Sequence, residues 1–149
     1  MQTLHQQRVE KFMKLAKQIL PLTPEIPIAS ICELRASLIL EEALETIAGL
    51  GCSFEMREAG AVNMENVEIL SNYGEPDLVA IVDGCCDLMV VTTGTLSACG
   101  DQDHLVQEAV DLNNLAKFGP GSSLRADGKL IKPPDHQPPN IKGILDAQD

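Results

Sequence analysis

The sequence predicts an all-α protein that folds as a bundle of four to five helices. Its 149 residues match the usual length of one domain, so a single domain is expected over 1–149. Apolar residues recur at helical spacing in four segments, and proline or glycine closes each of them. The helical core is predicted over about 4–118, followed by an extended, proline-rich tail over 119–149.

The first two helices are predicted at 4–20 and from about residue 31 to Gly49 or Gly51. The first has one apolar and one basic face, and the prolines at 21, 24 and 27 cannot continue it. Ser30 is the expected N-cap of the second helix, with Glu33 as its capping-box partner. Residues 52–75 mix short alternating runs with Gly and Asn, which predicts an irregular insertion or a small hairpin.

A third helix is predicted at 77–99, because its acidic residues have helical spacing and the segment is too long for a strand. Gly100 is its expected C-terminal stop. Asp101 or Asp103 opens a fourth helix, which ends at Gly119-Pro120. The last thirty residues hold five of the nine prolines, Pro120 included, so the tail is predicted to be extended rather than helical.

Composition places the chain among soluble, cytoplasmic proteins. No uninterrupted apolar run approaches the roughly 18 residues that span a bilayer, and the N-terminal segment does not have the pattern of a signal peptide. Five cysteines without metal-site spacing are expected to be reduced and mostly buried. The net charge of −11 comes from residues 36–116, where Arg57 stands against fifteen acids. This excess argues against binding a nucleic-acid duplex and favours either cation binding or a solvated acidic surface.

Acidic residues continue the apolar stripe of the second predicted helix. Glu41, Glu42 and Glu45 follow Leu38 at steps of three or four residues, so they lie on the same face as the apolar residues. Carboxylates removed from water without a partner cost several kcal/mol, and neighbouring ones repel one another. The pattern therefore predicts a bound positive charge.

The third predicted helix repeats this arrangement with Asp83 and Asp87, which are four residues apart and can reach one ion. An all-oxygen ligand set selects a hard cation, so Mg²⁺ is expected, with Mn²⁺ able to substitute. Acidic faces that meet solvent at the rim of a bundle are the alternative interpretation.

Four segments together resemble the MazG-like nucleotide pyrophosphohydrolases of the all-α NTP pyrophosphatase group. They are RASLILEEALE at 35–45, DGCCDLMVVTTGT at 83–95, NLAK at 114–117, and DGKLIKPP at 127–134 with QPPNI after it. The resemblance runs from about residue 8 to residue 145 and is strongest to the Cof-like or phosphoribosyl-ATP pyrophosphohydrolase-like branch. It implies a MazG-like bundle and hydrolysis of a nucleoside triphosphate to its monophosphate and pyrophosphate, in a homodimer or homotetramer.

The resemblance also implies roles for particular residues. Glu42, Glu45 and Asp87 would be Mg²⁺ ligands, and Glu41 would be a ligand or would orient the attacking water. Either Glu41 or Glu42 is the expected base. The usual downstream pattern is ExxD, but Gly84 stands three residues before Asp87, so Asp83 would have to supply the missing carboxylate.

Four further residues are predicted to bind substrate. Asn114 and Lys117 lie one helical turn apart and would touch sugar or phosphate, although a lysine also suits an exposed helix end. Lys129 and Lys132 would close over the triphosphate from a neighbouring subunit, or belong to a solvated tail. The insertion at 52–75 is expected to pack the dimer rather than line the base pocket.

The predicted function is therefore Mg²⁺-dependent (d)NTP pyrophosphohydrolysis for nucleotide-pool control or precursor supply, without nucleic-acid duplex or membrane partners. One alternative is a non-catalytic helical oligomer that binds nucleotide or a protein partner. A weaker alternative is phosphoribosyl-ATP hydrolysis.

Overall fold

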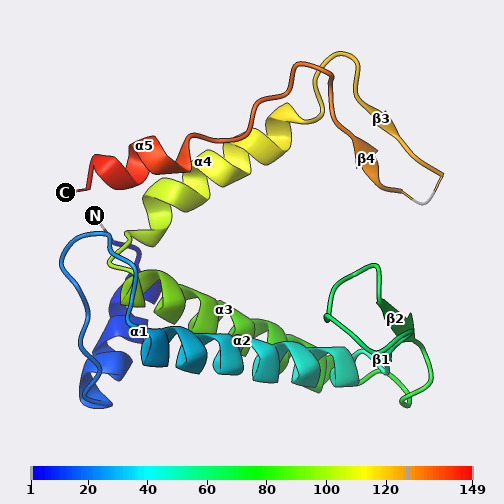
Figure 1. Cartoon of the computed structure of the whole chain (residues 1–149), viewed down its shortest axis with the longest axis horizontal. Helices are drawn as coiled ribbons and strands as arrows, with labels where there is room; N and C mark the ends of the chain where they lie inside the picture. Colours follow the sequence, from blue (N-terminus) through cyan, green and yellow to red (C-terminus); the bar gives the residue numbers. More distant parts are fainter. Residues whose placement is uncertain (1, 127, 149) are drawn as a thin grey trace. The chain divides into compact units, whose positions relative to one another are not determined.

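The computed structural model describes residues 2–126 and 128–148 and is predominantly helical. Its helices are α1 (Leu4–Leu15), α2 (Ala29–Gly49), α3 (Leu78–Ala98), α4 (Asp103–Ala116) and α5 (Ile141–Asp146), shown in Figure 1. Two antiparallel hairpins accompany them: β1 (Ser53–Met56) with β2 (Val67–Leu70), and β3 (Ser123–Leu124) with β4 (Leu130–Ile131). The expectation of a purely α-helical chain was therefore wrong in these two short sheets.

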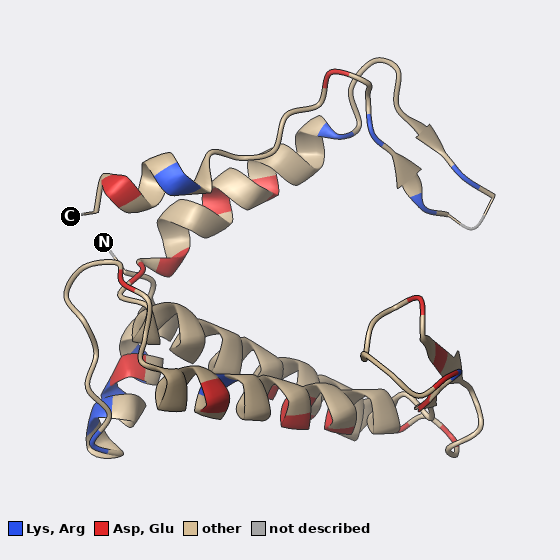
Figure 2. Cartoon of the chain, viewed as in Figure 1, with Lys and Arg blue, Asp and Glu red and all other residues tan. Residues whose placement is uncertain are grey.

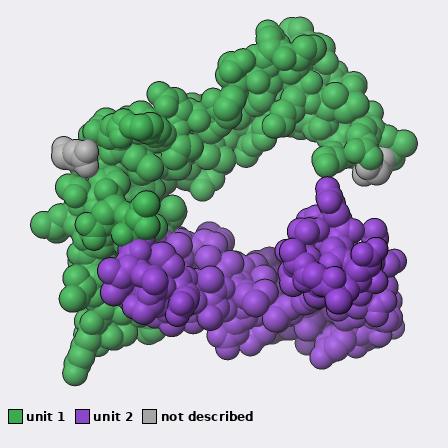
Figure 3. Space-filling model, in the orientation of Figure 1, with its two compact units in different colours: residues 1–26, 96–149 green, residues 27–95 purple. Residues whose placement is uncertain are grey.

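The chain forms two compact units, coloured separately in Figure 3. Unit 1 contains residues 1–26 and 96–149, and unit 2 contains residues 27–95. Unit 2 is thus a continuous segment inserted into unit 1, and the unit boundary falls near the end of α3.

Unit 2 is organised by close contact between α2 and α3, which lie side by side in Figure 1. A Cβ atom built on Gly84 would lie 2.5 Å from Thr46 Oγ1 and 3.1 Å from Thr46 Cα. A Cβ on Gly49 would lie 3.1 Å from the backbone of Ala80. Since Gly49 meets Ala80 and Thr46 meets Gly84, the two helices run antiparallel. Glycine at these positions lets the two backbones approach closely.

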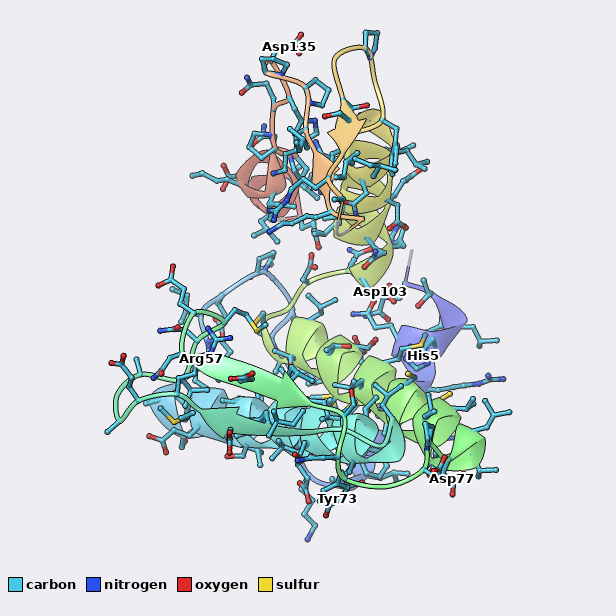
Figure 4. The ribbon with its side chains drawn as sticks, turned by 90° about the vertical axis from the view of Figure 1, so that its right-hand side faces the viewer. His5, Arg57, Tyr73, Asp77, Asp103 and Asp135 are labelled. Atoms are coloured by element: carbon cyan, nitrogen blue, oxygen red, sulfur yellow. The ribbon has the colours of Figure 1, made fainter. Side chains whose placement is uncertain are left out.

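Local side-chain contacts define the ends of the unit 2 elements. Asp77 Oδ1 accepts hydrogen bonds from the backbone N–H groups of Val79 and Ala80, which caps α3 at the position that Figure 4 labels. The predicted Ser30 cap of α2 was wrong, because the N-cap is Ile28 and no side chain caps this helix. Residues 53–70 contain the hairpin, which confirms the smaller element predicted for the insertion.

In unit 1, α1 ends earlier than predicted because of its own backbone, not because of the prolines. Lys17 has a φ of 59°, and the N–H of Gln18 donates to the carbonyl of Met13 at 2.9 Å. A left-handed residue at Lys17, followed by a hydrogen bond from Gln18 back to Met13, is the Schellman motif that ends many α-helices. At the other end, Thr3 Oγ1 accepts from the N–H of Gln6, so α1 has a side-chain N-cap.

The tail, predicted to be extended from its prolines, contains the β3–β4 hairpin and the helix α5. Asn140 caps α5 through a 3.1 Å hydrogen bond from the N–H of Gly143, so the prediction of a tail without helix was wrong. The proline-rich segment is held to α4 by Asn113, whose Nδ2 donates to the carbonyl of Gln137 at 2.7 Å and whose Oδ1 lies 3.2 Å from His136 Nε2.

Apolar side chains are exposed over much of the described chain. The buried hydrophobic residues are Val9, Met13, Val91 and Ala98. The five cysteines are unpaired with one another, but three of them are exposed, so the expectation that most would fill the core was wrong. The helices α2 and α3 each carry exposed leucine, isoleucine, valine or methionine side chains along their length.

The helix α3 is long and apolar enough, by length and composition, to cross a membrane. The expectation that no apolar run reaches this length considered uninterrupted apolar residues, whereas the α3 window contains Asp83 and Asp87. Core helices of soluble proteins meet the same criterion, although only 17% of this apolar window is buried here. Two carboxylates near the middle of a spanning helix would be costly in a bilayer.

Candidate functional site

The five acidic residues predicted for the site lie on the two packed helices of unit 2. Glu41, Glu42 and Glu45 belong to α2, and Asp83 and Asp87 belong to α3. In Figure 2 red segments on the ribbon mark acidic positions on both helices, whereas blue segments mark basic positions on α1 and the β3–β4 hairpin. Thr46 of α2 contacts Gly84 of α3, and the two helices are antiparallel. One turn back along α2 from this contact therefore lies opposite about one turn forward along α3, which places Glu42 opposite Asp87.

The buried face of α2 passes through this cluster. Arg35, Thr46 and Gly49 are buried, and Glu42 is half-buried at the matching helical position between them. Glu41 and Glu45 are exposed. The acids of α2 therefore differ in environment: Glu42 points toward the contact between the helices, and its two neighbours point more toward solvent.

The pKa of Glu42 responds to the other four carboxylates. Partial burial is the largest cause that raises the pKa of Glu42 above its ordinary value of about 4.5. The negative charges of Asp87, Glu45, Glu41 and Asp83 raise the same pKa further, in that order of strength. The acids predicted from the sequence to act together are thus close enough to influence one another across α2 and α3.

The contact between Gly84 and Thr46 leaves no room for a longer side chain at residue 84. Gly84 is buried, and even the Cβ of a longer residue would collide with Thr46. A glutamate cannot be placed there without separating the helices, whereas Asp83, one residue earlier, is exposed. Asp83 is consequently the carboxylate that this helix can offer beside Asp87.

The donor set suits a hard divalent cation, since it consists of carboxylate oxygens from two helices. Within residues 2–126 and 128–148, however, no three side chains of His, Cys, Asp or Glu are gathered around one point in metal-binding geometry. These side chains would have to change rotamer to hold an ion.

The predicted substrate-binding residues belong to unit 1. Lys117 Nζ donates to Asn114 Oδ1 at 2.5 Å, so the structure brings this pair together at the end of α4. Lys129 and Lys132 flank β4 and are exposed. The basic hairpin and the Asn114–Lys117 pair therefore present cationic and amide groups to solvent.

A cavity of about 360 Å³ lies beside this pair, between α4 and the proline-rich segment. Its lining includes Asn113, Ala116, Pro133 and His136, which lie next to the predicted residues but are not among them. Asp135, labelled in Figure 4 on the segment between β4 and α5, also lines it. The sequence offered a signal for this cavity only in the two proline pairs around His136.

No protein-family model matches the chain, and no curated protein matches it.

Proposed function

We propose that this chain is a Mg²⁺-dependent nucleoside triphosphate pyrophosphohydrolase. The observation that supports this function best is Glu42, a half-buried carboxylate whose pKa is raised by burial and by four other acids from two helices. Carboxylates are crowded in this way at sites that hold divalent cations and phosphate groups, where the opposite charge offsets their repulsion.

Glu42, Glu45, Asp83 and Asp87 would hold the ion. Bound there, Mg²⁺ neutralises phosphate oxygens and lowers the pKa of a water molecule. The chain's own contribution is the base. Glu41 is exposed beside Glu42 and is free to orient a water toward the α-phosphorus. Glu42, with its raised pKa, would be a stronger proton acceptor than an ordinary glutamate once ionised.

The reaction adds the oxygen of water to the α-phosphorus and breaks its bond to the bridging oxygen of the β-phosphate. The products are a nucleoside monophosphate and pyrophosphate. Lys117, Lys129 and Lys132 would bind phosphate oxygens, and Asn114 would donate to the sugar or phosphate. The biological role would be control of the nucleotide pool or supply of a monophosphate precursor, in the cytoplasm.

A homodimer or homotetramer is part of this proposal. The exposed apolar side chains of α2 and α3, such as Leu40 at 57% and Val79 at 78%, leave faces that a second copy can cover. Exposed apolar area of this kind marks protein contacts in soluble proteins.

The second candidate function is a non-catalytic helical oligomer that binds nucleotide or a protein partner. It is favoured by the absence, among the described residues, of three ligand side chains already arranged around one point. Phosphoribosyl-ATP hydrolysis is a further, weaker alternative within the first class of function.

The test is a pyrophosphate-release assay across the standard NTPs and dNTPs, dUTP and phosphoribosyl-ATP, with Mg²⁺, with Mn²⁺ and with chelator. We expect metal-dependent conversion of at least one substrate to its monophosphate, and loss of turnover in Glu42→Gln and Asp87→Asn. Glu33→Gln, an exposed acid earlier on α2, is the matched control and should retain activity. If no substrate releases pyrophosphate with either metal but a nucleotide still binds, the result would favour the non-catalytic helical oligomer.

A further inference from the structure

A cavity of about 310 Å³ lies in unit 1, and none of the five acidic residues of the candidate site on α2 and α3 lines it. We propose that it binds a short aliphatic ammonium or guanidinium ion through the carboxylate of Asp101. Its volume falls at the lower end of the range for small-molecule sites. This inference does not rest on the proposed function.

The walls of the cavity are tied together by Gln6, which is fully buried. Its Nε2 donates to Ser97 Oγ at 3.1 Å and to the carbonyl of Asp101 at 2.7 Å. Its Oε1 accepts from the N–H of Asp103 at 3.1 Å, at the start of α4, where Figure 4 labels this residue. One side chain thus fixes α1 against both the end of α3 and the start of α4.

A second wall is the segment from Leu20 to Leu22, which is held over Gly100. A Cβ on Gly100 would lie 2.2 Å from the carbonyl oxygen of Thr23, and its φ of +75° favours glycine. The N–H of Glu25 donates to the carbonyl of Cys99 at 2.9 Å and anchors the same segment. The cavity is therefore preformed by the fold rather than left by a loose loop.

Asp101 is the exceptional residue of this cavity, because it lines the space and is only 4% exposed. Its Oδ1 accepts one hydrogen bond, from Gln148 Nε2 at 2.7 Å. No described residue donates to Oδ2 or forms an ion pair with the carboxylate. A buried carboxylate with a single neutral donor is costly unless a cation offsets its charge.

The other charges of the cavity offset each other. Glu10 Oε2 lies 3.3 Å from Lys14 Nζ, and Glu10 Oε1 accepts from Gln2 Nε2. Glu10 and Lys14 therefore form a neutral pair, which leaves Asp101 as the uncompensated negative charge among the described lining residues. The remaining lining combines leucine and proline with amide groups, and this suits a short alkyl chain that carries a cationic head with N–H donors.

The experiment is calorimetric titration of the full chain with butylguanidinium and butylammonium, with butylurea as the neutral isostere of the first. We expect saturable binding of at least one cation, and binding of butylurea weaker by about tenfold or more, as for loss of a charged hydrogen bond. Asp101→Asn keeps the acceptor for Gln148 and should lower cation affinity by a similar factor. Asp111→Asn, an exposed acid on α4 outside the cavity, should leave it unchanged.

Gln148→Lys provides a second variant should Asp101→Asn fold poorly. It places an ammonium group of the chain beside Asp101, so it should abolish cation binding while the helix signal in circular dichroism stays unchanged. Equal affinity for butylurea and butylguanidinium, no saturable cation binding, or unchanged binding in Gln148→Lys would overturn the proposal. Pyrophosphohydrolase activity is not a readout, so its loss or presence does not affect this test.

Discussion

Glu42 shows how one residue connects the sequence pattern to a measurable property. Its folded-state pKa is raised above the ordinary value of about 4.5, so the folded chain binds this proton more tightly than the unfolded chain does. Stability from this group is therefore fully present below pH 4.5 and is lost as pH rises through the raised pKa.

We predict that the metal-free protein unfolds at lower denaturant concentration as the pH rises from about 4.5 through the raised pKa of Glu42. Glu42→Gln should reduce this dependence, because the amide does not ionise. The measurement is the urea midpoint at a series of pH values in chelator, with Glu33→Gln as the control that keeps the slope. A slope equal in Glu42→Gln and the wild type would contradict the role of Glu42.

The Asn114–Lys117 pair supports a prediction about substrate affinity. Lys117 is partly exposed, and its ammonium group donates a hydrogen bond to Asn114 Oδ1 at 2.5 Å. Lys117→Met should therefore raise the KM for the nucleotide by about tenfold, the effect expected for loss of a charged contact. Lys142→Met removes an exposed lysine on α5 and is the control. Steady-state kinetics would contradict this role if both variants changed KM equally.

At the scale of elements, the packing of α2 against α3 depends on glycine residues where the two helices meet. Gly84→Ala should destabilise the protein by about 1–3 kcal/mol, because its Cβ would overlap Thr46. Gly84→Glu, which restores the common ExxD pattern, should destabilise it more and should not improve metal binding. Chemical denaturation measures both effects.

The control is a double-mutant cycle with Thr46→Ala. Removing Thr46 Oγ1, the nearest atom, should recover part of the stability lost in Gly84→Ala, so the two changes should not be additive. If the changes in the free energy of unfolding from the two substitutions simply add, residues 46 and 84 are not in contact.

The sequence predicted the helices at 31–49, 77–99 and 103–118 well, because apolar spacing and glycine stops are local signals. The start of α2 and the end of α1 were predicted poorly. Ser30 satisfies a capping pattern without being the N-cap, and Lys17 adopts a left-handed conformation that its residue type does not favour. Both outcomes depend on backbone geometry that single residues do not specify.

The candidate site was predictable in one part and not in another. The five acids are predictable because helical spacing places them on apolar stripes, and four of them raise the pKa of the fifth, Glu42. That they act together in a metal site stays a prediction. Asp101 was considered only as the start of a helix. It accepts hydrogen bonds from Gln6 and Gln148, which lie 95 and 47 residues away, and no local pattern predicts such contacts.

At the scale of the whole molecule, the exposed apolar faces predict self-association. Light scattering should report a dimer or tetramer, and Val79→Glu on α3 should shift it toward the monomer, because a charge is costly at an apolar contact. Val62→Glu, at an equally exposed position in the β1–β2 loop, is the control. A monomeric wild type would contradict the proposed oligomer.

The insertion of unit 2 within unit 1 has a consequence for synthesis on the ribosome. Residues 27–95 are contiguous, so α2, the hairpin and α3 can pair as soon as they emerge. The helix α1 is made first but finds its partners Ser97 and Asp101 only 91 and 95 residues after Gln6. At about 5–20 residues per second, Gln6 remains without these partners for about 5–20 seconds. The nascent chain is therefore most open to chaperone capture at its N-terminal helix, and translation speed should affect its yield.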